Sequence, residues 1–403
     1  MTDRPTLPAL TGMRFFLAFL VLLFHQTEAD GFLDRSTLNG HPLLAHMLQS
    51  GYVSVGFFYL LSGFVLAYGY DLSRVWDAKL KQKFWLARFA RIYPVYFLCL
   101  LFSLPLFVSL LHRTVPAFHT PTSVIAFITT PVLVQSWFPD SATLWNGPSW
   151  SLSDEIFFYL LFPLVGRLLW KIDRLTILLP LAISIWLMGL ALTFGVARMK
   201  CQVLINMGAT GTPAASFWSN LIKYDPLLHL AEFCAGILAA KLHLKLRDKR
   251  FRHWWLREGL WLYGPALILE VFVLTHSQWI PYGLLHNGLL VPVHVALLIG
   301  LSLGGQGLPR FLGSRPLVFL GQSSYALYLL HVATYSWMHA TFKHLSHILM
   351  SGLWFLALYS VLCVGLSCIM FAYVEEPARR LILKRFSARL PDAAHLAESP
   401  RSP

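Results

Sequence analysis

His25 and Glu155 are the two residues of this sequence best suited to acid–base chemistry. Each stands at the end of an apolar run, where an ionisable side chain is costly and is therefore a functional candidate. Ser151 precedes Glu155 by four residues, so the two would share one face of a helix. A carboxylate beside an imidazole fixes the tautomer of the ring and stabilises its charged form. The pattern therefore predicts a general-base site built from His25, Glu155 and Ser151.

Helix capping is the structural alternative for the acidic pair Asp154 and Glu155. Ser151 or Ser153 could cap a helix that begins there, and carboxylates are stabilised in a first helical turn. Capping accounts for one carboxylate and leaves Asp154 as a rival to Glu155 for the chemical role.

Three arginines offer positive charge near this site. Arg14 lies eleven residues before His25, about 16 Å along a helix. It would either snorkel to the headgroups or face a cavity as a fixed cation. Arg88 and Arg91 are three residues apart at the expected cytoplasmic start of the apolar run 90–111. Because a guanidinium fork matches phosphate oxygens, the pair predicts a phosphate clamp, with a simple topogenic flank as the alternative.

A second set of polar residues lies in a late apolar run. Ser324, Tyr328 and His331 would share a helix face at positions i, i+4 and i+7, with Tyr325 adjacent. They predict either part of a pocket or hydrogen bonds to a neighbouring helix.

Two further groups are candidates for structural pairing. His229 and Glu232 form an expected polar pair at spacing i, i+3, and Glu232 is also a candidate pocket residue. Glu375 and Glu376 precede Pro377 and are expected to pair with nearby arginines.

The composition describes the elements that must position these residues. The 403 residues are 56% hydrophobic and 13% charged, whereas soluble domains carry about 25% charged residues. This excludes a soluble enzyme, a disordered chain and a fibrous protein, and it predicts an all-α polytopic membrane protein. The five cysteines contain no CxxC motif, which argues against a disulfide framework and a metal site.

Ten apolar runs approach the roughly 20 residues that a spanning helix needs. They are 8–27, 52–70, 90–111, 153–171, 175–195, 226–242, 259–276, 284–303, 317–338 and 352–373. An eleventh run, 123–137, is shorter and contains Pro131.

The distribution of lysine and arginine predicts the orientation. Basic residues gather after the second run, in 241–257 and after the last run, and cytoplasmic loops carry such an excess. Ten crossings with both termini in the cytoplasm satisfy this pattern if 123–137 is a re-entrant or interfacial element beside a cavity. The net charge of +13 then reflects topology and attraction to anionic lipids, with no nucleic-acid role. Residues 1–376 form the expected membrane domain, and 377–403 a short basic cytoplasmic tail that is expected to be disordered.

The sequence resembles the acyltransferase-3 family of integral membrane acyltransferases, which includes O-acetyltransferases of O-antigen, exopolysaccharide and nodulation factors. Seven segments carry the resemblance in the family's order: LTGMRFFLAFLVLLFH (10–25), GYVSVGFFYLLSGFVLAYGY (51–70), RFARIYPVYF (88–97), QSW with NGPSWSLSDEIFFYLLFP (135–163), LAEFCAG (230–236), LGQSSYALYLLH (320–331) and VEEPARR (374–380). Family members also have about ten spans. One departure is His229, which stands where the family often has arginine.

The resemblance implies a function and a set of roles. Acetyl-CoA would be the donor substrate, bound from the cytoplasm, with no permanently bound cofactor and no metal. The acceptor would be a hydroxyl of an extracytoplasmic glycan or glycolipid, at a bacterial inner membrane. The motif matches fall on Arg14, His25, Arg88, Arg91, Ser151, Glu155, Ser324, Tyr325 and His331. His25 is expected to deprotonate the acceptor or to carry the acyl group transiently, with Glu155 orienting it and Arg14 or Ser151 stabilising an oxyanion.

Other functions remain open at this stage. The donor could carry a longer acyl group, and the acceptor could be peptidoglycan, a lipid or a small secondary metabolite. A secondary transporter or a flippase for a lipid-linked glycan would share the many spans and the intramembrane charges. Against transport, no internal repeat is visible, and the candidate acid and histidine lie toward one side rather than at the midplane.

Overall fold

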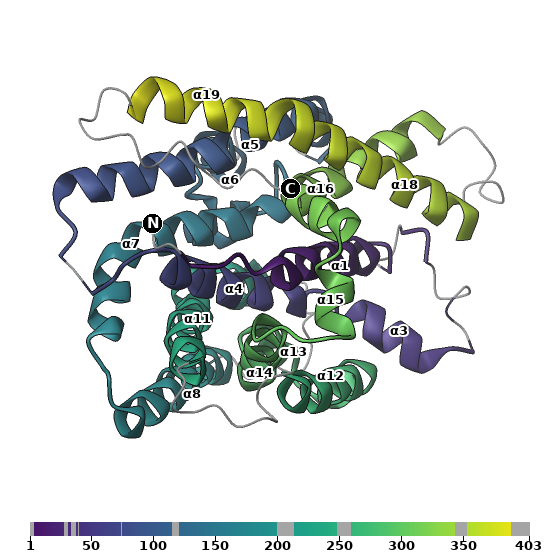
Figure 1. The fold of residues 1–403 in the computed structure, drawn as a ribbon. Helices are drawn as coiled ribbons and strands as arrows, with labels where there is room; N and C mark the ends of the chain where they lie inside the picture. Colours follow the sequence, from purple (N-terminus) through teal and green to yellow (C-terminus); the bar gives the residue numbers. More distant parts are fainter. Residues whose placement is uncertain are drawn as a thin grey trace.

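The chain folds into a bundle of helices (Figure 1). The computed structural model describes residues 4–27, 31–33, 38, 40–73, 75–114, 121–199, 213–247, 259–342 and 353–387. No strand occurs in these ranges, which confirms the all-α prediction. Much of the basic segment 241–257, and Arg35, Arg74, Lys343 and Arg389, lie outside them.

The helices follow one another with short connections. They are α1 (Pro8–His25), α3 (Pro42–Gln49), α4 (Val53–Gly69), α5 (Ala78–Thr114), α6 (Pro121–Thr129), α7 (Trp150–Trp170), α8 (Leu175–Met199), α10 (Pro213–Tyr224), α11 (Pro226–Leu246), α12 (Leu260–Thr275), α13 (Tyr282–His286), α14 (Val291–Ser302), α15 (Leu308–Leu312), α16 (Arg315–Phe342), α18 (Leu353–Met370), the π segment η7 (Phe371–Glu375) and α19 (Glu376–Ser387). Three short 3₁₀ turns, η1 (Gln135–Trp137), η2 (Pro139–Ser141) and η3 (Gly147–Ser149), lead into α7.

All ten predicted apolar runs are largely helical, and the structure is that of a multi-pass membrane protein. In the described residues, 7 helical stretches are long and apolar enough to cross a membrane, or 8 if the bent pair α3–α4 forms one span. Two predicted spans fall outside this set. Helix α12 has only 16 residues, and α7 carries Asp154, Glu155 and Arg167. Ten crossings and cytoplasmic termini therefore stay predictions.

The position expected for Arg88 and Arg91 at a helix start is wrong. Helix α5 begins at Ala78 and runs for 37 residues, so it is about 55 Å long. Arg88 and Arg91 lie ten and thirteen residues inside it. The Lys-rich stretch before Arg88 contains no proline or glycine to end a helix, and hydropathy alone detects only the apolar part.

The segment 123–137 does not form a continuous spanning helix. The nine-residue helix α6 ends at Thr129, and Leu133 then adopts a left-handed conformation with φ of 59°. Tyr96 and Tyr93 of α5 donate hydrogen bonds to the carbonyl groups of Thr130 and Pro131, at 2.5 and 3.3 Å. These contacts hold the turn against the middle of α5. Its depth relative to the lipid stays a prediction.

The expected disorder of 377–403 is wrong for its first part. Helix α19 extends to Ser387 and packs against α5, as Figure 1 shows at the top of the view. Glu376 stabilises its first turn through ion pairs with Arg379 and Arg380, at 3.0 and 2.7 Å. Residues 388–403 lie outside the described ranges.

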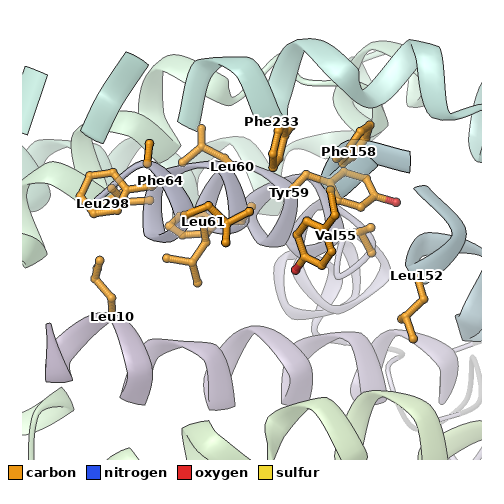
Figure 2. Packing of buried hydrophobic residues seen from close by; sticks show 14 of the residues in the cluster. Leu10, Val55, Tyr59, Leu60, Leu61, Phe64, Leu152, Phe158, Phe233 and Leu298 are labelled. Carbon is orange, nitrogen blue, oxygen red and sulfur yellow. The ribbon is translucent and has the colours of Figure 1, made fainter. Parts of the chain in front are cut away.

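The core of the bundle lies around α4. Tyr59 of α4 meets the ring of Phe158 from α7 edge-on, with ring centroids 5.2 Å apart. Phe158 in turn stacks on Phe233 of α11 at 5.1 Å (Figure 2). Leu60 and Phe64 are fully buried on the same helix as Tyr59. This packing fixes α7, which carries Ser151 and Glu155, relative to α4 and α11.

Two glycines allow α4 and α11 to approach closely. A Cβ atom on Gly236 would stand 2.0 Å from the carbonyl oxygen of Leu60, and one on Gly63 would stand 2.1 Å from that of Phe233. Small residues of this kind are typical of membrane helix interfaces.

We expect Gly236→Leu to separate the two helices and to destabilise the protein, since overpacking a tight interface costs at least about 1–3 kcal/mol. The measurement is the thermal midpoint of the purified protein in detergent. Gly365→Leu is the control, because nothing lies within 4 Å of its Cβ position. Equal midpoints for the two variants would contradict this account of the interface.

Candidate active site

Five charged side chains from four elements converge inside the bundle. This charged cluster consists of Arg14 of α1, Arg88 and Arg91 of α5, Glu155 of α7 and Glu375 of η7. Arg14 interacts electrostatically with Arg91, Glu155 and Glu375. Within the described residues no direct ion pair joins these arginines to the two glutamates. The opposite charges therefore face one another at a distance.

Glu155 is held by neutral hydroxyl groups. Ser62 of α4 donates a hydrogen bond to its Oε1 atom at 2.9 Å, and the hydroxyl of Tyr159 donates to the same oxygen. The Tyr159 carbonyl accepts a hydrogen bond from the indole of Trp85 at 3.1 Å. Helices α4, α5 and α7 thus fix the carboxylate jointly.

Arg88 lies between this carboxylate and a cavity. Its guanidinium lies 5.8 Å from the ring centroid of Phe84 and 5.9 Å from that of Tyr159. Its Nε atom is buried and has no hydrogen-bond partner among the described residues. The cavity of about 220 Å³ is lined by Trp85, Arg88, Phe89, Ile92, Tyr93, Val132, Leu133, Ile156, Tyr159 and Leu160. A cavity beside the segment 123–137 agrees with the expectation from the sequence.

His25 lies beside a second histidine. Its ring centroid is 5.1 Å from that of the buried His331 on α16. The Nδ1 atom of His331 is hydrogen bonded to the Tyr328 carbonyl oxygen at 2.8 Å. Its Nε2 atom is buried without a hydrogen-bond partner in the described part of the chain. One nitrogen of this second ring is therefore left for a ligand.

Tyr328 connects the histidine pair to α7. Its hydroxyl and that of Ser151 are 2.9 Å apart, and its ring centroid is 5.9 Å from that of His331. Ser151 stands one helical turn from Glu155. A line of polar side chains therefore runs from the charged cluster, through Ser151 and Tyr328, to His331 and His25.

The structure does not place His25 and Glu155 in direct contact. Among the described residues, the hydrogen bonds of Glu155 come from Ser62 and Tyr159. The pairing expected from the sequence is replaced by a link that passes through α16. The two residues still belong to one connected set.

The capping explanation for Ser151 and Ser153 is wrong. Helix α7 has Ser149 as its N-cap, with no side-chain capping hydrogen bond. Ser151 donates to the Pro148 carbonyl at 3.1 Å, and Ser153 is bonded to Ser136 at 2.7 Å. The rival acid Asp154 is fully buried and accepts a hydrogen bond from Tyr59 at 2.7 Å. It therefore belongs to a different network from Glu155.

The remaining candidates divide between the two regions. His229 and Glu232 form the predicted pair, at 3.0 Å between Nδ1 and Oε2, and both are buried. They lie with Tyr59, away from the charged cluster. Ser324 bonds only its own helix, at the Gly321 carbonyl, within the described residues. Tyr325 donates to the Ile92 carbonyl at 2.9 Å, one residue after Arg91.

Three site residues were not selected from the sequence. Tyr159 follows Glu155 by four residues and Ser151 by eight, so extending the same helical series would have found it. Glu375 was assigned to pairing near the surface, but it is buried and faces Arg14 and Arg91. Ser62 gave no signal, because a serine in an apolar helix is common.

These features define a class of protein: a multi-pass membrane enzyme with histidine, tyrosine and charged groups inside its helix bundle. The chain belongs to the acyltransferase-3 family, whose model, described as an acyltransferase domain, matches residues 7–372.

Curated relatives agree with this family. The chain is 30% identical to "Acyltransferase MdmB" of Streptomyces mycarofaciens over 405 aligned positions, covering 96% of each chain. It is 33% identical over 123 positions to "Protein 2 in picA locus" of Rhizobium radiobacter, which covers 27% of this chain and 62% of the relative. No solved structure matches the chain.

Proposed function

We propose that the protein transfers an acetyl group from cytoplasmic acetyl-CoA to a hydroxyl group of an extracytoplasmic carbohydrate. The acceptor class is an O-antigen, an exopolysaccharide or a similar glycan, at a bacterial inner membrane. The observation that carries the proposal is the line of polar side chains between the charged cluster and the histidine pair. Such a line suits a donor that enters at one end and an acceptor that enters at the other.

The charged cluster is the donor end. Coenzyme A carries phosphates that cannot enter hydrocarbon, and a guanidinium fork binds phosphate oxygens. Arg88 and Arg91 are the proposed ligands of those phosphates, with Arg14 next along the path. The three arginines exceed the two glutamates of the cluster by one positive charge, which favours an anionic ligand.

The histidine pair is the reacting end. The acceptor oxygen attacks the thioester carbonyl, the new C–O ester bond forms, and the C–S bond breaks. In the base mechanism, His25 takes the hydroxyl proton and returns it to the departing sulfur, so that free coenzyme A leaves as the thiol. In the carrier mechanism, His25 first takes the acyl group itself and then passes it to the acceptor hydroxyl without hydrolysis.

Ser151, Tyr328 and Glu155 have supporting roles in this proposal. The hydroxyls of Ser151 and Tyr328 face the line and could donate to a developing oxyanion. Glu155, which contacts Tyr159 and Ser62 rather than His25, orients the middle of the path and balances the charge of Arg14 and Arg88.

The test is acyl transfer by the purified full-length protein in liposomes. Acetyl-CoA with a labelled acetyl group is supplied, together with surface glycan from a strain that lacks the gene. We expect labelled ester on the glycan, and we expect mass spectrometry to show one acetyl group fewer per repeat in the deletion strain.

Two outcomes would contradict the proposal. Acetyl-CoA-independent movement of a lipid-linked glycan across the liposome, with no ester formed, would identify a flippase. Efficient transfer from a longer acyl-CoA but not from acetyl-CoA would keep the acyltransferase and remove the acetyl donor.

A further inference from the structure

Two neighbouring glutamates at the end of the last spanning segment lie in opposite environments. Glu375 closes the π segment η7 and is buried, with 5% of its surface exposed. Glu376 starts α19 and is ion-paired to Arg379 and Arg380. A π turn adds one residue per turn, which rotates the residues after it about the helix axis, and such turns are frequent at functional sites. The turn explains why Glu375 points inward and Glu376 does not.

Glu375 is a buried carboxylate without a hydrogen-bond donor at one of its oxygens. Its Oε2 atom has no partner among the described residues. Burial of an uncompensated carboxylate is costly, so its charge must be balanced by other groups. The groups available are the positive side chains of Arg91 and Arg14, followed by Arg379.

The arginines need this carboxylate as much as it needs them. Arg14 and Arg91 repel each other, and Glu155 and Glu375 are the carboxylates that offset the repulsion at Arg14. Glu155 is also occupied by Ser62 and Tyr159. Glu375 faces the same guanidinium groups that an incoming anion would use, and it makes no close ion pair with them in the described residues.

We propose that Glu375 is a resident anion that balances Arg14 and Arg91 in the empty site and competes with the phosphates of the donor for them. This inference rests on the proposed function, because it assigns the arginines to an acyl-CoA. Glu375 is thus a positioning residue that sets how tightly coenzyme A is held. Competition of this kind weakens donor binding and assists release of free coenzyme A after transfer.

The experiment measures the Kd of coenzyme A for the full-length protein in lipid nanodiscs by calorimetry. In Glu375→Gln the shape is kept and the competing charge is lost. We expect the Kd to fall by about 5- to 100-fold, the range of a typical coupling between two ligands. The thermal midpoint without ligand should fall, and its rise on adding coenzyme A should grow. A purely structural role would lower the midpoint without tightening binding.

Glu376→Gln is the matched control and should keep the Kd of the unmodified protein. If Glu375→Gln does not fold, Glu375→Asp withdraws the carboxylate by one methylene and should also tighten binding, by less. Equal or weaker binding in the folded Glu375 variant overturns the inference alone. No binding of coenzyme A by the unmodified protein overturns the inference together with the proposed donor.

Discussion

His25→Ala should abolish acyl transfer while the protein stays in the membrane at its normal level. The ring of His25 lies at the end of α1, beside that of His331, where the polar line from the charged cluster ends. Loss of a positioned general base costs about 100- to 10,000-fold in rate, and loss of a covalent carrier removes the pathway altogether. The measurement is ester formation on the acceptor per mole of folded protein.

His339→Ala is the control for this variant. His339 stands on the same helix as His331, about two turns further on, and it is exposed and stacks on Tyr335. It should keep full activity. Unchanged transfer by His25→Ala would remove His25 from the reaction and leave the His25–His331 contact as packing.

One additional measurement separates the two roles of His25. The protein is incubated with labelled acetyl-CoA in the absence of acceptor, and the peptide that contains residue 25 is weighed. Retained acetyl on that peptide supports the carrier, and an unmodified peptide supports the base. The sequence leaves both open, because an imidazole at the end of an apolar helix suits either.

The fold was largely predictable because hydropathy reports where helices cross lipid. Each of the ten apolar runs is largely helical, and short turns between them follow proline and glycine. The failures have a common cause. Helix α5 extends into a Lys-rich stretch and α19 continues beyond Glu376, since polar residues form helices as readily as apolar ones when no breaker intervenes. Hydropathy therefore found the apolar part of each helix and missed its polar extension.

The site was predictable only residue by residue. Spacing within a helix identified Ser151 with Glu155, and Tyr328 with His331, because positions four and three apart share a face. Spacing could not show that Ser151 meets Tyr328 across helices, or that Glu155 meets Ser62 instead of His25. Those contacts depend on how α4, α7 and α16 pack, and a single sequence holds no record of that packing.

Glu375 illustrates the same limit. Beside an arginine-rich tail, the pair Glu375 and Glu376 is expected to make surface ion pairs, and Glu376 does so. The π turn in η7 gives Glu375 the opposite fate. Helical periodicity assumes a constant rotation per residue, so it cannot anticipate an element that changes that rotation.

The double variant Arg88→Ala with Arg91→Ala should lose donor binding and not acceptor binding. Each charge-assisted hydrogen bond to a phosphate contributes about 1.5–3 kcal/mol, so the KM for acetyl-CoA should rise by at least about 100-fold. The depth of the two arginines in α5 makes the prediction sharper than the sequence alone allows. A topogenic flank belongs at a helix end, whereas these residues lie ten and thirteen positions inside the helix, beside Glu155 and the cavity.

The matched control removes positive charge from the same helix nearer its start. Lys79 lies nine residues before Arg88, about 13 Å along the axis, so Lys79→Ala should leave the KM for acetyl-CoA unchanged while lowering the net charge. Arg88→Lys keeps the charge but not the planar fork, so it should fall between the unmodified protein and Arg88→Ala. If the double variant binds coenzyme A with the affinity of the unmodified protein, the arginines serve the packing of α5 against α7, and the donor must enter elsewhere.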